Sequence, residues 1–203
     1  MEDLKAVVGQ NEKILFEGKP NKKCYIFESI FNPLLPFAIL WGFLDFFILG
    51  TAIFNSDGDK SFLLFLIPFM LVHLMPVWIY LSGIILTMRK YKNTNYIVTD
   101  GAIYVSGGAF SLTINRKPFA ELSHIDLHRG FFDQMFNVGD IIATSAQNSS
   151  SSRSAAISID SISDYIDVYN LVKKLQTDIY ADTMYPNDKR PGENHGYNTE
   201  YKG

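Results

Sequence analysis

Two ionisable side chains stand inside long apolar runs of the sequence. Asp45 is the only charged residue between positions 34 and 54, and His73 is the single histidine of the uncharged run 62–87. Ionisable groups in such surroundings are costly and are candidate functional sites. The pair could serve a proton-linked or ligand-responsive switch. The alternative, which we favour, is a structural role as a hydrogen bond between helices or a polar face toward another subunit.

The spacing of the two residues predicts a similar depth for both. Seven residues, 55–61, separate the runs, and the Asp57-Gly58 pair at their centre predicts a tight turn between antiparallel helices. Asp45 and His73 lie 13 and 15 residues from Gly58. At about 1.5 Å per residue, their depths differ by about 3 Å. The spacing leaves open whether the two side chains face each other.

A second group of candidate ligands alternates along a predicted strand. His124, Asp126 and His128 share one face, because successive side chains of a strand point to opposite faces. Three such residues spread over about 13 Å, too far for one zinc ion with bonds of about 2 Å. We expect a solvated strand face and no metal site.

Catalytic chemistry has no support in the residues. The single cysteine, Cys24, can form neither an internal disulfide nor a zinc cluster of cysteines. The sequence has no nucleophile–base motif, phosphate loop, HExxH motif or dinucleotide fingerprint. We therefore expect no enzyme and no cofactor. The net charge of −3 also argues against nucleic acid as a partner.

The two apolar runs are predicted transmembrane helices. A helix needs about 20 apolar residues to cross the hydrocarbon core, and the runs 34–54 and 62–87 both qualify. Pro68 and Pro76 lie inside the second run and should kink its helix. The two helices would form a hairpin in the bilayer.

Lysine and arginine residues set the predicted orientation. Four lysines lie between positions 13 and 23 and three basic residues follow the second run, whereas the linker 55–61 has one lysine. Cytoplasmic flanks carry the excess of these residues. We expect a multi-pass cell-membrane protein with both termini cytoplasmic and residues 55–61 extracytoplasmic. The lipid bilayer is its first expected partner.

From position 91 the apolar pattern changes to period two, which predicts short strands separated by turns such as Asp100-Gly101. The expected strands are 96–99, 102–106, 110–115, 124–128, 141–145 and 155–159, with a serine-rich loop at 148–154. An amphipathic helix is predicted after the N-cap region Ser163-Asp164. Its apolar stripe is Ile166, Tyr169, Val172, Leu175 and Ile179.

These patterns predict a membrane α-helical hairpin followed by an α+β soluble domain. The soluble domain is expected to be a small antiparallel β-barrel or sandwich capped by a C-terminal helix. The expected boundaries are a cytosolic N-terminal segment at 1–33, the hairpin at 34–88, the soluble domain at 89–180 and a disordered tail at 181–203.

Two sets of residues could form binding surfaces. Possible contacts to anionic lipid headgroups are Arg89, Lys90, Lys92, Arg116 and Lys117. The positive-inside effect already explains the first three. A possible partner interface is the aromatic stretch with Phe131, Phe132, Met135 and Phe136. This stretch could instead dip into the bilayer or pack in the core, and core packing is the first expectation.

The order of several motifs resembles a family of bacterial membrane proteins in which a helical hairpin precedes a pleckstrin-homology-like (PH-like) domain. The matching stretches are Glu12–Pro20, Tyr96–Asp100, Leu122–Asp126, Phe136–Ile142 with its glycine-aspartate pair, and the closing helix. The resemblance covers residues 12–177. It implies a PH-like fold without catalytic residues. Basic residues that are frequent in the family are replaced here by Ala102-Ile103 and Val105-Ser106, so a binding role of those positions does not carry over.

We therefore expect a membrane-anchored, non-enzymatic interaction or scaffold protein. Its cytosolic PH-like domain would bind a protein partner, a second copy or lipid headgroups. The hairpin would anchor the chain and support a homo-oligomer or a complex with a protein partner. The alternative is a small membrane transport or sensing component that uses Asp45 and His73.

Overall fold

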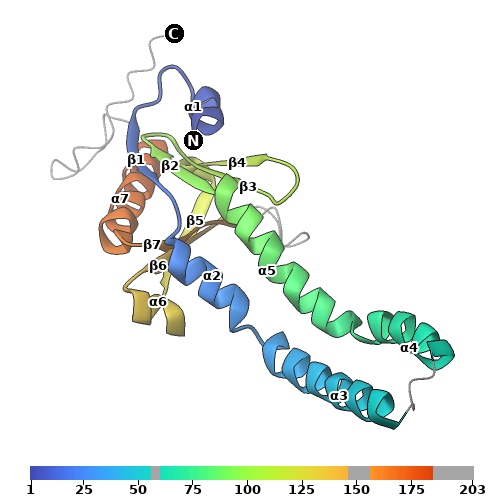
Figure 1. The fold of residues 1–203 in the computed structure, drawn as a ribbon. Helices are drawn as coiled ribbons and strands as arrows, with labels where there is room; N and C mark the ends of the chain where they lie inside the picture. Colours follow the sequence, from blue (N-terminus) through green and yellow to red (C-terminus); the bar gives the residue numbers. More distant parts are fainter. Residues whose placement is uncertain (56–59, 146–155, 185–203) are drawn as a thin grey trace. The chain divides into compact units, whose positions relative to one another are not determined.

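The computed structural model describes residues 1–55, 60–145 and 156–184 (Figure 1). The chain divides into two compact units. The β-rich unit contains Met1–Tyr25 and the chain from Lys90 onwards, and the apolar unit is Ile26–Arg89. The predicted serine-rich loop at 148–154 and residues 185–203 of the predicted tail lie outside the described residues, whereas residues 181–184 of that tail belong to the last helix.

Helices build the apolar unit. They are α3 (Leu34–Asn55), α4 (Lys60–His73), the last residues of α2 (Lys22–Ile30) and most of α5 (Met75–Asn93). By length and composition alone, Leu34–Phe54 could cross a membrane, with a mean hydropathy of 2.0 and only 11% of its most apolar stretch buried. Within the described residues, a second crossing exists only if the bent pair of α4 and α5 counts as one span.

The run 62–87 forms two helices where one kinked helix was expected. α4 ends at His73 and α5 begins two residues later, with a bend of 54° between them. Pro76 has no N–H to donate to a preceding carbonyl, so it is tolerated in the first turn of a new helix. Pro68 instead lies inside α4 without ending it. The predicted distortion therefore concentrates at Leu74.

Antiparallel strands form two sheets in the β-rich unit. The first sheet has the order β1 (Ile14–Gly18), β2 (Asn95–Thr99), β3 (Ala102–Gly107) and β4 (Thr113–Pro118). The second has the order β5 (Leu122–His128), β6 (Gly139–Ser145) and β7 (Ala156–Ile162). No ladder joins the two sheets among the described residues, so the closed form of the predicted barrel is not present there.

The first strand was not predicted. β1 lies in the expected N-terminal segment 1–33 and pairs with β2, with Glu17 opposite Ile97. Residues 1–25 therefore belong to the folded β-rich unit. The available signal was the short apolar run Ile14-Leu15-Phe16, which has no alternation and is too short to distinguish a strand from other structure.

The strand expected at 110–115 begins later. β4 starts at Thr113, and Phe110 is 79% exposed. Gly108 adopts a φ of +125°, and a Cβ at this position would overlap the backbone oxygen of Ser111. A glycine is therefore required where the chain turns, and the turn extends over residues that alternate like a strand.

Helix α7 (Tyr165–Met184) packs against β5 and β6, as expected of a closing helix. Val168, Val172 and Leu175 are buried in the core that the two sheets share. Ile166, predicted as part of the stripe, is 55% exposed, because Tyr165 and Val168 occupy the buried face instead. The remaining short helices are α1 (Glu2–Val7), α6 (Phe131–Phe136) and the 3-10 turn Phe119–Glu121.

Candidate functional site

Asp45 and His73 contact each other in the apolar unit. Asp45 lies on α3, His73 is the last residue of α4, and His73 Nδ1 is 2.7 Å from Asp45 Oδ1. Asp45 is 2% exposed. Its second carboxylate oxygen, Oδ2, is buried and has no hydrogen-bond partner among the described residues. The spacing of the two residues along the chain predicted only their depth. The rotation of each helix about its axis, which the structure shows, turns their side chains toward each other.

Aromatic rings hold His73 in place. The indole of Trp41 stacks on the imidazole with 5.2 Å between ring centroids, and Trp41 Nε1 donates to the His73 carbonyl at 2.8 Å. Phe69 also stacks on the imidazole, at 5.4 Å. Trp41 precedes Asp45 by four residues, and Phe69 precedes His73 by four, so each helix presents an aromatic ring one turn before its ionisable residue. This spacing was readable in the sequence, and Trp41 was missed.

A carboxylate and an imidazole can share a hydrogen bond either as an ion pair or as a neutral pair, and both forms join α3 to α4. The arrangement therefore suits a stable link between the two helices. Asp45 Oδ2, which has no partner among the described residues, is an acceptor for a further donor.

The β-rich unit contains a polar cleft of about 390 Å³. Lys90, Tyr96 and Asp160 contribute to its lining, together with β3, β4 and β7. Burial raises the pKa of Tyr96, and the nearby Asp160 carboxylate raises it further. Burial also raises the pKa of Asp160. The cleft thus combines one ammonium group with a carboxyl group in a partly desolvated setting.

The predicted headgroup contacts have different neighbours. Lys90 lines the polar cleft, whereas Lys92 lines a smaller cavity of about 270 Å³. Arg116 Nε donates to the Tyr104 hydroxyl at 2.9 Å, and Arg116 Nη2 pairs with Glu12 at 3.1 Å. These residues do not line one shared cleft. Lys117 lies on β4, and Arg89 belongs to the apolar unit. Headgroup binding by this set remains a prediction.

The aromatic stretch forms helix α6 and is only partly packed. Phe131 is 76% exposed and Met135 is 54% exposed, and their spacing of four residues places them on one helix face. Phe132 and Phe136 are half-buried. Core packing was therefore the wrong expectation for Phe131 and Met135. A partner interface on this face remains a prediction.

The histidine-containing strand presents its polar residues to solvent. His124, Asp126 and His128 are all exposed on β5. Among the described residues, their ligand atoms do not form a group compact enough to share one metal ion.

The glycine-aspartate pair has a structural explanation. A Cβ on Gly139 would lie 2.9 Å from Cγ of Tyr165, so only glycine lets β6 approach α7 this closely. Asp140 Oδ1 accepts a hydrogen bond from the Ser161 N–H at 2.6 Å, where Ser161 has a φ of +53°. Burial raises the pKa of Asp140 to about 6, although the Ser161 hydrogen bond opposes the shift. Both residues support the fold.

One family model, described as "Bacterial PH domain", matches residues 34–176. Comparisons with curated proteins and with solved structures find no match. The matched region runs from the start of α3 into α7, so it includes the apolar helices as well as most of the two sheets.

Proposed function

This chain belongs to the bacterial PH domain family, and from this premise we propose that it is a membrane-anchored, non-enzymatic interaction protein. Domains of the PH-like kind typically bind proteins or lipids and are not typically catalysts. In the proposal, the apolar unit is a two-span hairpin in the cell membrane with both termini in the cytoplasm. The β-rich unit then binds a protein partner, a second copy or lipid headgroups at the cytoplasmic face.

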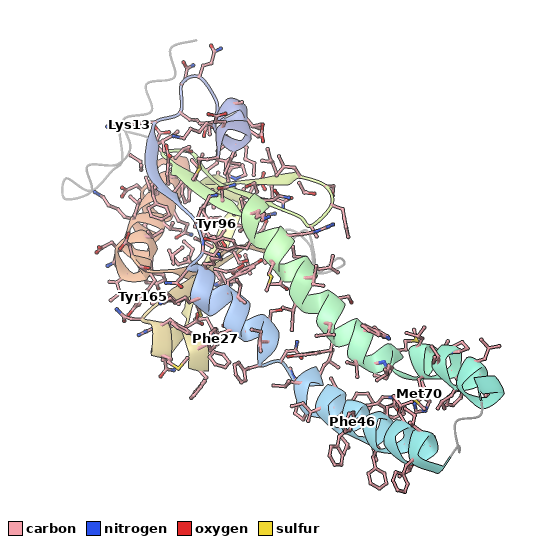
Figure 2. All side chains as sticks on the ribbon, in the orientation of Figure 1. Lys13, Phe27, Phe46, Met70, Tyr96 and Tyr165 are labelled. Atoms are coloured by element: carbon pink, nitrogen blue, oxygen red, sulfur yellow. The ribbon has the colours of Figure 1, made fainter. Side chains whose placement is uncertain are left out.

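The observation that carries the proposal is the apolar surface of α3. Phe43, Phe46, Phe47 and Phe54 are 64%, 76%, 63% and 89% exposed. Phe46 points away from α4, whereas Met70 lies between the two helices and is buried (Figure 2). Contiguous exposed apolar surface on this scale needs a non-aqueous cover, and a helix of this length matches the hydrocarbon core.

Anchoring and orientation can be tested by cysteine labelling. Cys24 is buried and its thiol donates to Asp133 Oδ1 at 3.4 Å, so Cys24→Ser retains a donor and gives a cysteine-free background. We would add Ser56→Cys in the linker or, as the matched control, Asn170→Cys on the exposed surface of α7. A membrane-impermeant maleimide should label Ser56→Cys in spheroplasts, and Asn170→Cys only after lysis. The reverse pattern would overturn the orientation, and recovery of the chain in the soluble fraction would overturn anchoring.

The interaction part of the proposal has a separate test. Full-length protein extracted into nanodiscs is purified under mild conditions, and the mass of the particle is measured. A defined oligomer, a stable protein partner or enrichment of one headgroup class over the bulk lipid of the disc supports the proposal. A monomer with neither a protein partner nor an enriched lipid contradicts it.

The Asp45–His73 contact favours a second candidate function, a small transport or sensing component. The supporting observation is that buried Asp45 Oδ2 has no partner among the described residues, because such a group is retained at a cost. An Asp45→Asn chain keeps the size of the side chain and removes its charge. Normal assembly with loss of a cellular phenotype would support sensing or transport, whereas loss of assembly would support a structural role.

A further inference from the structure

Helix α1 covers a second apolar face of the first sheet. Leu4 is 1% exposed and packs with Ile97, Ala102 and Tyr104, a cluster separate from the main core. α1 contacts β2 and β3 and lies beside them in the ribbon (Figure 1). Without α1, these side chains would present an uncovered apolar patch on the outside of the sheet.

The packing beneath α1 is incomplete. The cavity of about 270 Å³ is lined by Met1, Leu4 and Asn95, among others. Asn95 is 4% exposed, and its Oδ1 is buried without a hydrogen-bond partner among the described residues. Protein interiors rarely leave such an acceptor without a partner, and the cavity opens to solvent beside α1. A six-residue helix also has little stability of its own. Local opening of α1 should therefore cost much less free energy than global unfolding.

The base of this N-terminal segment is firmly held by Glu12. Its carboxylate accepts hydrogen bonds from the Thr99 hydroxyl at 2.6 Å, the Tyr104 hydroxyl at 3.0 Å and Arg116 Nη2 at 3.1 Å. Burial alone would raise the pKa of Glu12, but these hydrogen bonds outweigh it and lower the pKa below its usual value. Only α1 and residues 8–11 can therefore detach from the sheet and move while the sheet stays intact. Short hinges of this kind favour exchange of an element between copies.

The structure shows that α1 itself fits the apolar face of the first sheet. Leu4 fills the site on the sheet, and Lys5 Nζ pairs with Glu17 Oε2 at 2.7 Å. Every copy of the chain carries the same helix and the same face, so exchange between two copies preserves each contact and forms an isologous dimer. This step rests on the proposed function in one respect only: anchoring in one bilayer raises the local concentration of copies.

We infer that α1 is an exchangeable element and that the face of the first sheet beneath it also accepts α1 from a second copy of this chain. The polar contacts of Glu12 hold the end of the moving segment in place, and the cavity beside Asn95 lowers the free energy needed to detach α1. The resulting dimer joins two β-rich units through their N-terminal segments.

The test uses two full-length chains in the Cys24→Ser background. One carries Lys5→Cys and the other Glu17→Cys with a larger tag, so each chain has one thiol. Both positions are partly exposed and lie outside the cores. The chains are co-expressed, extracted in mild detergent and treated with a short bis-maleimide. Exchange predicts a cross-linked product of both tags, at least about fivefold above the matched control in which Lys173→Cys on α7 replaces Glu17→Cys.

Two further chains distinguish exchange between copies from contact within one copy. Deleting residues 1–7 from the Glu17→Cys chain leaves its face empty, so its yield of cross-link to the Lys5→Cys chain should rise further. A double Lys5→Cys/Glu17→Cys chain reports the unexchanged arrangement. Efficient cross-linking within the double chain, with no product between chains above the Lys173→Cys control, would overturn the inference. That outcome leaves the labelling test of anchoring untouched, because the cross-linking is read in detergent.

Discussion

His73 Nδ1 lies 2.7 Å from Asp45 Oδ1, across two helices that follow one another in the chain. The contact uses one carboxylate oxygen and leaves the other, Oδ2, buried and without a partner in the part of the chain that the structure describes. A link of this kind stabilises the pairing of α3 and α4 as long as both members are present. The contribution of this contact to the free energy of unfolding is therefore best measured by replacing one residue of the pair or both.

The two single replacements should destabilise the apolar unit, whereas the double replacement should have little effect. His73→Phe leaves Asp45 buried without a partner and should lower stability by about 3–5 kcal/mol. Asp45→Leu leaves the His73 imidazole without its carboxylate partner and should cost about 1–3 kcal/mol. The double variant removes both polar groups and should be close to the parent. Thermal unfolding in detergent measures all three, and a double variant as unstable as His73→Phe would contradict the coupling.

Trp41→Phe should destabilise the apolar unit by about 1 kcal/mol, because the ring contact with His73 is kept and the Nε1 hydrogen bond to the His73 carbonyl is lost. Trp78→Phe is the matched control. Trp78 Nε1 also donates to a backbone carbonyl, that of Leu71, at 3.2 Å, but this bond is longer and lies on the exposed surface of the unit, so its loss should cost less. Equal losses in the two variants would show that burial at Trp41 is unimportant.

Gly139→Ala should destabilise the β-rich unit by about 1–3 kcal/mol, because the new methyl group meets the Tyr165 ring. Chemical denaturation of the full chain in detergent measures the change. Gly50→Ala on α3 is the control, since no atom lies within 4 Å of its Cβ position. A Gly139→Ala chain as stable as the parent would show that the ring moves freely.

Asp140 should make the stability of the β-rich unit depend on pH. Its folded pKa, about 6, exceeds the usual 3.8, so the native state binds the proton more tightly than the unfolded state does. The favourable contribution is complete below pH about 4 and is lost as the pH rises through about 6. Asp140→Asn keeps an acceptor for Ser161 and should abolish this decline. Unfolding midpoints of parent and variant from pH 4 to pH 7 test the sign, and an unchanged pH profile in the variant would refute the assignment to Asp140.

The exposed face of α6 should matter for binding and little for folding. Phe131→Ser together with Met135→Ser should change stability by about 0.5 kcal/mol or less, because both side chains are exposed. If this face is the partner interface, the variant should lack the oligomer or protein partner that the nanodisc measurement is expected to find with the parent chain. Ile166→Ser, which removes another exposed apolar side chain on α7, is the control. A variant whose particle has the same mass as that of the parent would show that α6 is not part of the interface.

Local patterns predicted much of the architecture. β-forming residues and turn signals located β2, β3 and β6 approximately, alternating polarity located β5 and β7, and a three- and four-residue step located α7. Alternation and the helical step are informative because one face of such an element is buried against a core. β1 was missed because an edge strand of five residues has few buried positions. The break at Leu74 was blurred because Pro68 and Pro76 carry the same local signal, and only the packing decides which one is accommodated.

The sequence by itself determined which residues could form a polar pair in the apolar unit, since Asp45 and His73 stand out against uncharged runs whose lengths place them at similar depth. Only the tertiary structure decided that they touch, because contact depends on the rotation of each helix about its axis and on the end of α4 at His73. Likewise, the N-terminal residues read as a polar leader to the first apolar run. Their place on the first sheet follows from pairing between positions 78 to 87 residues apart, which no local pattern encodes.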